Sequence, residues 1–424
     1  MKKRFAASAM ILAMSAATVL SPLTTFAEAE EQELNIAIFQ GGYGDAYWNQ
    51  MVELFEASHE GVKVNMTISP TIGDIIRPQI VAGNAPDFIC LNDGGEDGVI
   101  LSLIKEHALL NLDDVFDGEN YAGTGTLRDD ITDGILSSTK CAPYGDDEIY
   151  LAPFNSGPQG LIYNKTFFDE NNLEVPKTWE ELVDQAAADG GVQFDATSIY
   201  YDLGFVRACG GYIFKYQDGA YDTADIGLDN EGSVEAYAFI NDLCNKYKLI
   251  TADVTADIAR SNFQNGKCAY YIGGPWDIDG FTSAGTKFAV AKMPTFHGQP
   301  FVTPVGTQVS FVSNSSKNQD AAWDFISYLM ENGALGMYEA GDRIPAKLAD
   351  QKLDEIQSNA YTQAFVEQIN DGEPMPTVSE MGQLWSIHTN NIRSMWSGEQ
   401  TPEEAAKNMV TQLKEAIELM NSGK

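Results

Sequence analysis

The spacing of apolar and polar residues changes period along the first part of the chain. Leu34 to Phe39 is apolar enough for a buried strand, and from Tyr47 to Ser58 the apolar residues recur with the spacing of an amphipathic helix. Val62 to Ile68 then predicts a second strand. This order of strand, helix and strand predicts a βαβ unit with parallel strands.

The next segment repeats this order. A helix from Ile72 to Ala82 leads through a turn into a strand from Asp87 to Leu91. In open α/β sheets, ligands bind just beyond the carboxyl ends of the strands. We therefore predict two ligand loops, Gly41 to Asp45 and Asn92 to Gly95.

A strand-like run from Pro153 to Gly157 lies within the segment Ile149 to Tyr163, which we interpret as a crossing between two lobes. The chain has 424 residues, of which 44% are hydrophobic, and this length exceeds what one ordinary core holds. The sequence has no low-complexity linker and no short repeat. We therefore predict two domains joined by ordinary strands.

Two later helices have recognisable starts. Thr178 with Glu181, and Thr401 with Glu404, match the capping box, in which a threonine caps the helix and a glutamate three residues later reciprocates. Trp179 lies at the first of these helix starts. We interpret it as a packing residue and not as a ligand contact.

The first residues have the pattern of a secretory signal. Met1 to Arg4 is basic, Phe5 to Leu23 is apolar, and small residues follow around Ala27 to Ala29. We predict a signal peptide over residues 1–29, cleaved near Ala27–Ala29. The protein is then exported to the periplasm or to the extracellular face of the cell membrane.

Composition excludes several classes of function. A formal net charge of −35 repels nucleic acid, so no nucleic-acid partner is expected. The same charge favours a neutral or cationic ligand. The alternative is that the charge only keeps the protein soluble and carries no information about the ligand. The five cysteines form no C-x-x-C pair and the four histidines are dispersed, so we expect no metal site and interpret most cysteines as buried residues.

The chain lacks the common catalytic and cofactor motifs. It has no G-x-S-x-G, H-E-x-x-H or P-loop sequence. Gly42 to Tyr47 imitates a dinucleotide fingerprint, but Tyr47 stands at the third glycine position, so we expect no cofactor. A glycosidase with two paired carboxylates remains an alternative among 61 acidic residues. We predict that the protein is not an enzyme.

Aromatic residues in turns are the most informative feature. Trp276 follows a predicted strand, Lys267 to Ile272, through Gly-Gly-Pro, and Trp385 lies on a helix after the turn at Met375-Pro376. A sugar has an apolar C–H face that a flat aromatic covers, while polar groups bind the hydroxyls on its rim. The residues that supply such a set are Trp276, Trp385, Tyr200, Tyr43 and Asp93.

A rival hypothesis keeps two lobes and changes the ligand to a metal ion, a polyamine or an anion. Such ligands require clustered carboxylates, tyrosines or arginines more than bare indoles. Arg207 and Arg343 are the basic residues that we nominate for an anion.

Several motifs resemble the maltose and maltodextrin-binding proteins, which are extracellular solute-binding proteins of carbohydrate ABC transporters. They occur in that family's order over nearly the whole chain beyond the signal. These motifs are Leu161–Lys165, Pro176–Trp179, Gly210–Gly219, Ile226–Asn230, Phe263–Lys267, Gly274–Trp276, Pro294–Pro300 and Met375–Pro376 with Trp385.

The resemblance implies a two-lobed α/β fold of the periplasmic-binding-protein type. Each lobe is expected to be a mostly parallel sheet flanked by helices, with a hinge between the lobes and a ligand cleft at their interface. We predict an N-terminal lobe from residues 30–154 and 307–355, and a C-terminal lobe from residues 155–306 and 356–424.

The resemblance also implies a carbohydrate-binding site. Trp276 and Trp385 are similar to the family's stacking tryptophans, and Tyr200 to the aromatic residue of the second lobe. Asp93 is similar to the acid that accepts hydroxyl protons, and Asn92 precedes it. Asn155 and Tyr43 complete the predicted site.

Four positions depart from the family pattern. The family has a basic residue where this chain has Gly94, and a tryptophan around the position of Cys90. It has a lysine near the position of Gly44 and a glutamate near the position of Gly157. We therefore predict an oligosaccharide ligand without assigning it to maltose. The implied partners are the permease subunits of an ABC importer, and we expect a monomer.

Overall fold

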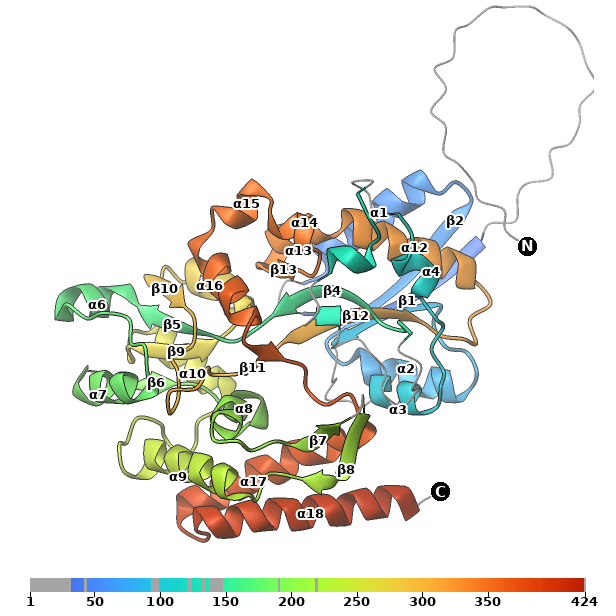
Figure 1. Cartoon of the computed structure of the whole chain (residues 1–424). Coiled ribbons are helices and arrows are strands. Elements are labelled where there is room, and N and C mark those ends of the chain that lie inside the picture. Colours follow the sequence, from blue (N-terminus) through green and yellow to red (C-terminus); the bar gives the residue numbers. More distant parts are fainter. Residues whose placement is uncertain are drawn as a thin grey trace, which may run out of the picture.

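The chain folds into two lobes that are each built on a β-sheet (Figure 1). The computed structural model describes residues 32–41, 44–92, 99–119, 124–131, 135–136, 148–189, 191–217 and 220–422. The predicted signal peptide lies outside these residues. The two-lobed α/β prediction is confirmed.

The larger sheet has six strands in the order β13-β4-β12-β3-β1-β2. Their bounds are Ile344–Pro345, Ala152–Gly157, Gly306–Val312, Phe88–Asn92, Gln32–Phe39 and Val62–Ser69. The strand β1 pairs in parallel with both β2 and β3, as the two predicted βαβ units require. The helices of this part of the chain are α1 (Ala46–Ser58), α2 (Ile72–Val81), α3 (Val99–Lys105), α4 (Asp113–Phe116), η1 (Arg128–Asp130), α12 (Gln319–Asn332), α13 (Ala334–Gly341) and α14 (Leu348–Gln351).

The smaller sheet has four strands in the order β10-β5-β9-β6, with bounds Phe288–Ala291, Gly160–Asn164, Tyr270–Gly273 and Val192–Gln193. Two pairs of short strands accompany it, β7 (Phe214–Gln217) with β8 (Ala220–Ile226) and β11 (Thr303–Pro304) with β14 (Gly372–Glu373). The remaining helices are α6 (Lys165–Asn171), α7 (Trp179–Asp189), α8 (Ile199–Ala208), α9 (Glu231–Asn245), α10 (Ala256–Gln264), η2 (Pro275–Asp277), α11 (Ile278–Ser283), α15 (Asp354–Gln357), α16 (Ala360–Ile369), η3 (Ser379–Gln383), α17 (Leu384–Ser397) and α18 (Pro402–Ser422).

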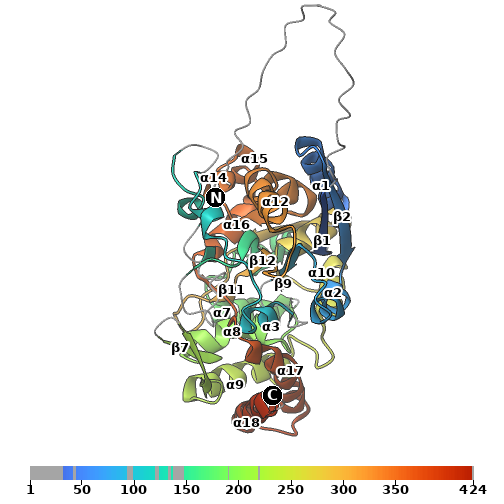
Figure 2. The same ribbon diagram turned by 90° about the vertical axis from the view of Figure 1, so that its right-hand side faces the viewer.

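The helix α18 packs along α17 and α9, at the end of the molecule remote from β1 and β2 (Figures 1 and 2). Its start has the predicted capping box, because the Glu404 amide donates to the Thr401 hydroxyl and the Thr401 amide donates to the Glu404 carboxylate. In the part of the chain that the structure describes, no helix is both long and apolar enough to cross a membrane.

The prediction that both sheets are mostly parallel is wrong. In the larger sheet β12 pairs antiparallel with β3 and β4, and β13 pairs antiparallel with β4. In the smaller sheet β5 is antiparallel to β9 and β10, and only β6 with β9 is parallel. The cause is the passage of the chain between lobes. The strands β4 and β12 carry the chain out of the larger sheet and back into it, so their direction is not set by a βαβ crossover within one sheet.

The predicted crossing is confirmed by the strands on either side of it. The strand β4 belongs to the larger sheet, and β5, which begins at Gly160, belongs to the smaller one. Only Pro158 and Gln159 separate the two strands, so the crossing between the two sheets is short (Figure 1).

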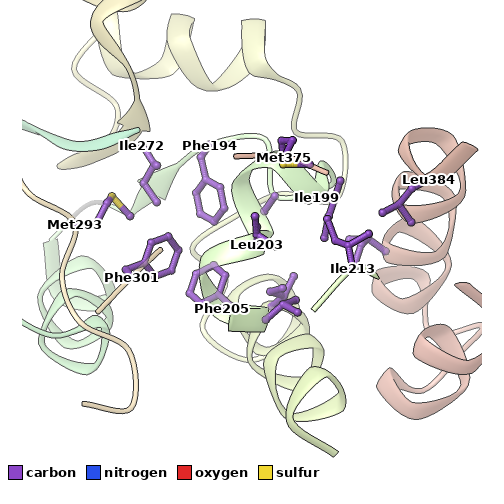
Figure 3. Close-up of a cluster of buried hydrophobic side chains, with 14 of the residues drawn as sticks. Phe194, Ile199, Leu203, Phe205, Ile213, Ile272, Met293, Phe301, Met375 and Leu384 are labelled. Carbon is purple, nitrogen blue, oxygen red and sulfur yellow. The ribbon is translucent and has the colours of Figure 1, made fainter. Parts of the chain in front are cut away.

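Two clusters of buried apolar side chains form the core of the protein. One lies between the larger sheet and helices α1 and α12, and includes Trp48 and Phe325. The other runs from the opposite face of that sheet, at Ile89, into the smaller lobe. Figure 3 shows its smaller-lobe part, where Phe205 and Phe301 point toward one another from α8 and a neighbouring loop.

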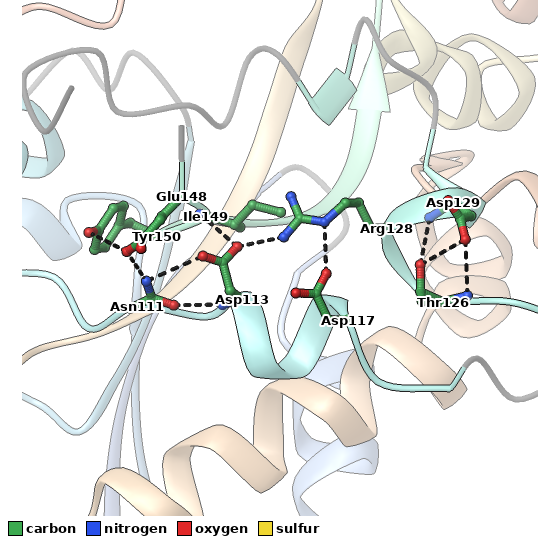
Figure 4. A network of polar contacts seen from close by, with 9 residues as sticks. All are labelled: Asn111, Asp113, Asp117, Thr126, Arg128, Asp129, Glu148, Ile149 and Tyr150. Carbon is green, nitrogen blue, oxygen red and sulfur yellow. Dashed lines mark hydrogen bonds and ion pairs between the residues drawn. The ribbon is translucent and has the colours of Figure 1, made fainter. Parts of the chain in front are cut away.

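A polar network fixes the segment that leads to β4 (Figure 4). The Arg128 guanidinium donates to Asp113 at 2.5 Å and to Asp117 at 2.9 Å. The same Asp113 oxygen accepts the Ile149 amide at 3.2 Å. Hydrogen bonds to both carboxylates raise the pKa of Arg128 against the opposing effect of burial, so the guanidinium stays charged.

The cysteines of the described residues are free thiols. Cys90, Cys244 and Cys268 are buried, and Cys209 is half-buried. Burial raises the pKa of Cys90 and Cys268 to about 12, and that of Cys209 to about 11. Cys141 lies outside the described residues.

Trp179 anchors the core of the smaller lobe, as predicted. It is fully buried, and its ring centroid lies 4.6 Å from that of Phe205 and 5.6 Å from that of Phe301. We expect Trp179→Ala to lower the free energy of unfolding by about 3–5 kcal/mol, because it removes a large buried ring and leaves a cavity. Urea unfolding measures this loss. A change below about 1 kcal/mol would show that the site collapses around the smaller residue.

Candidate functional site

Trp276 lies on a turn that requires glycine at position 274. It is the middle residue of η2, directly after β9. A Cβ atom added to Gly274 would lie 2.3 Å from the indole, so the ring folds back over a position that must be glycine. Pro275 begins the turn and fixes its backbone φ. The Gly-Gly-Pro-Trp sequence therefore places the indole outside the core of the lobe, where it is half-buried.

The indole of Trp276 lies where the two lobes meet. A Cβ atom on Gly157, the last residue of β4 in the larger sheet, would lie 3.2 Å from it. The Arg343 guanidinium, which precedes β13, lies over the ring at 5.7 Å from its centroid. From the smaller lobe, the ring of Tyr200 lies at 6.3 Å between centroids, inclined by 55°. Trp276 thus contacts residues of both lobes.

Tyr200 is tied to the crossing between the lobes. It lies in the first turn of α8, where the Ser198 hydroxyl accepts its amide at 3.3 Å. Its carbonyl accepts the side-chain amide of Gln159 at 2.6 Å, and Gln159 is fully buried in the crossing. Because Gln159 connects β4 to β5, the start of α8 is held at a fixed position beside the crossing.

Asn155 joins the two crossing strands. It is 3% exposed, and its amide donates to the Gln308 side chain on β12 at 2.7 Å. Gln308 is 4% exposed. The contact pairs two buried polar side chains, so it fixes β4 against β12 close to the indole of Trp276. Its role in ligand binding stays a prediction.

Trp385 is half-buried on α17 and packs against the apolar cluster of the smaller lobe. Its indole N–H is buried and has no hydrogen-bond partner among the described residues. The preceding η3 contacts α3 of the larger lobe. Trp385 therefore follows a segment that touches both lobes, although its place in a ligand site stays a prediction.

Three predicted site residues cannot be compared with the structure. Tyr43 and Asp93 lie outside the described residues. Asn92 is the last residue of β3 and pairs with Gln308 through the backbone, but its side chain is not described. The roles of these residues stay predictions.

Helices α8 and α17, which carry Tyr200 and Trp385, share a buried pair of ionisable residues. Asp202 on α8 and His388 on α17 are both fully buried, with His388 Nε2 at 3.7 Å from Asp202 Oδ2. The other ring nitrogen, Nδ1, donates to the Thr197 carbonyl at 3.0 Å. Burial lowers the pKa of His388 to about 4 and raises the pKa of Asp202 well above its usual value. Burial therefore disfavours the charged form of both side chains.

Sequence reasoning missed the residues that surround the indole. Arg343 was nominated for an anion, and Gly157 only as a departure from a family pattern, yet both lie against Trp276. Arg207, the other nominated basic residue, pairs with Glu373 at 2.9 Å. Spacing along the chain gave no signal for these contacts, because each joins segments that are distant in sequence. Among the described residues, no group of three or more His, Cys, Asp or Glu side chains is placed to hold a metal ion.

Comparison with known proteins gives a consistent result. A family model described as bacterial extracellular solute-binding protein matches residues 41–335. A galactooligosaccharide-binding protein of Bacillus subtilis is 29% identical over 392 residues, which cover 88% of this chain and 87% of that protein. A maltooligosaccharide ABC transporter solute-binding lipoprotein of Streptococcus pneumoniae is 26% identical, over 97% of this chain and 95% of that protein.

The fold is likewise found among solved structures. The maltose-maltodextrin binding protein of Alicyclobacillus acidocaldarius superposes with a TM-score of 0.78 at 25% identity. The match covers 90% of this chain and all of that one. The arrangement of both lobes is thus shared over almost the full length.

The buried pair predicts a pH-dependent stability that becomes stronger when Asp202 is removed. In the parent protein the two shifts oppose one another, because the raised pKa of Asp202 favours proton binding by the folded state, whereas the lowered pKa of His388 disfavours it. In Asp202→Asn the folded His388 stays neutral down to about pH 4, whereas the unfolded histidine binds a proton below about 6.5. The unfolded state then holds more protons, so the free energy of unfolding decreases as the pH is lowered from about 6.5 to about 4, by up to about 3 kcal/mol.

Urea unfolding at several pH values between 4 and 7.5 tests this prediction. The difference between Asp202→Asn and the parent protein should widen toward acid pH. In the double variant Asp202→Asn/His388→Gln that widening should disappear. Parallel pH curves for Asp202→Asn and the parent protein would contradict the raised pKa of Asp202.

Proposed function

We propose that this chain, which belongs to the bacterial extracellular solute-binding proteins, captures an oligosaccharide between its two lobes and delivers it to the permease of an ABC importer. Relatives that align over most of its length are named for binding galactooligosaccharides and maltooligosaccharides. The chain is exported by a signal peptide over residues 1–29, and it works as a monomer without a cofactor.

The position of Trp276 is the observation that carries this proposal. A half-buried indole at the meeting of two lobes offers a flat apolar surface to the C–H face of a pyranose. A ligand on this ring contacts both lobes at once, so it binds the closed arrangement of the lobes better than the open one. That difference in affinity shifts the population toward closure, which the permease recognises.

The proposed site draws on both lobes. The N-terminal lobe, which is built on the larger sheet, comprises residues 30–154 and 307–355, and the C-terminal lobe, which is built on the smaller sheet, comprises residues 155–306 and 356–424. The strand β4 of the larger sheet continues past this boundary to Gly157. Aromatic side chains cover the faces of the sugar rings, and carboxylate and amide groups bind the hydroxyls. The proposed carbohydrate-binding residues are Trp276, Trp385, Tyr200, Asn155, Tyr43, Asn92 and Asp93.

An anionic ligand is less well supported. Arg207 already has a carboxylate partner, since its guanidinium pairs with Glu373 at 2.9 Å and also donates to the Gly211 carbonyl at 3.1 Å. Arg343 lies over the ring of Trp276. A formal net charge of −35 also disfavours the approach of an anion.

Removal of the indole should weaken sugar binding. We expect Trp276→Ala to lower the affinity for maltotriose or galactotriose, whichever binds better in a thermal-shift screen, by about tenfold or more. Isothermal titration calorimetry measures the loss. The control is Tyr216→Ala, which removes an aromatic side chain that is 59% exposed on the β7–β8 hairpin and should leave affinity unchanged. Equal affinity of Trp276→Ala and the parent protein would exclude the indole from the site.

The protein should bind these sugars without cleaving them. After overnight incubation with the same trisaccharides, we expect no release of new reducing ends above a protein-free control. A glycosidase needs two carboxyl groups on either side of the glycosidic bond, and no such pair is assigned to the proposed site. Reducing ends that increase with protein concentration would overturn the non-catalytic proposal.

A further inference from the structure

We infer that the ion pair between the buried Asp277 and the partly exposed Arg260 is a positioning device that holds the indole of Trp276 in the orientation that receives a sugar ring. This inference rests on the proposed function, because it assigns a role within the same site. Neither residue belongs to the predicted carbohydrate-binding set.

Asp277 follows Trp276 directly, and its carboxylate is fully buried. One oxygen accepts the Arg260 Nε–H at 2.7 Å. The other accepts the Tyr271 hydroxyl at 3.1 Å and the Gly274 amide at 3.3 Å. Both oxygens are therefore used, by groups on α10, on β9 and in the turn itself.

These contacts close the turn around Trp276. The Gly274 amide donates to the Asp277 side chain, and the Asp277 amide donates back to the Gly274 carbonyl at 3.0 Å. The two residues that flank Pro275 and Trp276 are thus joined twice. Since proline fixes one backbone angle within this loop, little rotation remains for the residue that carries the indole.

The space beneath the turn is filled by the same carboxylate. A Cβ atom added to Gly273 would lie 2.3 Å from Asp277 Oδ2 and 2.2 Å from the ring of Tyr271. The carboxylate thus fits a site that glycine leaves open. The indole on the other side of the turn is held against Gly157 of the crossing. A movement of Asp277 would therefore change the distance between Trp276 and the larger lobe.

A buried carboxylate needs a partner of opposite charge. Burial raises the pKa of Asp277, and the charge of Arg260 and its hydrogen bonds oppose that rise. Arg260 is only partly exposed, and its Nη1 also reaches the exposed carboxylate of Asp257 at 3.1 Å. Loss of the charge on Asp277 would leave the Arg260 guanidinium with only Asp257, on the solvent side, as a charged partner. The Arg260 side chain would then move away from the loop that carries Trp276.

The test is a double-mutant cycle between Asp277 and Trp276. We expect Asp277→Asn to lower trisaccharide affinity by about tenfold in the parent protein, because the indole loses its fixed orientation. In the Trp276→Ala background the same substitution should have little further effect. Asp257→Asn is the matched control, because it removes the exposed carboxylate that contacts the same arginine, and it should leave affinity unchanged.

A spectroscopic measurement reports on the indole without requiring a sugar. The emission of Trp276 is obtained by subtracting the fluorescence spectrum of a Trp276→Phe variant. In Asp277→Asn this difference spectrum should shift to longer wavelength, because a loosened indole is more exposed to water. In Asp257→Asn it should not shift.

The outcomes separate the inference from the function on which it rests. An equal loss of affinity in both backgrounds would show that Asp277 acts only on the lobe as a whole, and an unchanged affinity with an unchanged spectrum would also overturn the inference. If the parent protein binds no oligosaccharide, the proposed function fails, while the fluorescence shift still decides whether Asp277 positions the indole.

Discussion

Two sheets built from one chain require strands that pass between them with their polar groups buried. Buried polar groups are costly unless they are hydrogen-bonded. At this crossing the requirement is met by side chains, with Asn155 donating to Gln308 and Gln159 donating to the Tyr200 carbonyl. These contacts fix β4, β12 and α8 relative to one another. The site around Trp276 depends on this fixed frame, because its neighbour Gly157 lies on β4 and its neighbour Tyr200 lies on α8.

The smaller lobe buries two carboxylates near this frame, and it does so in two different ways. Asp277 keeps its charge close to Arg260, with hydrogen bonds to both oxygens. Asp202 instead lies beside the buried His388, and burial raises the pKa of Asp202 and lowers that of His388 to about 4. The first arrangement suits a turn at the edge of the lobe, where the arginine remains partly in water. The second suits a contact between two helices that water does not reach.

The sequence predicted local structure well and tertiary contacts poorly. The elements from β1 to β3 were predicted because apolar spacing and turn residues are local signals, and the turn of Trp276 was found because Gly-Gly-Pro excludes a regular core position. The direction of β12 was not predictable, since it depends on where the chain has already crossed. Arg260 was missed because it reaches Asp277 only after α10 packs beside β9. Asn155 was predicted as a ligand contact, whereas the contact that the structure gives it joins two strands.

The free thiols have a consequence for how the chain acquires its fold. An extracellular protein folds where oxidants convert cysteine pairs into disulfides, and only the thiolate form reacts. Once Cys90 and Cys268 are buried, with pKa values raised to about 12, almost no thiolate remains at neutral pH. Completion of the core therefore protects these cysteines from mixed disulfides. The vulnerable period is the interval before the strands that carry them are covered, so rapid closure of the core also limits chemical damage.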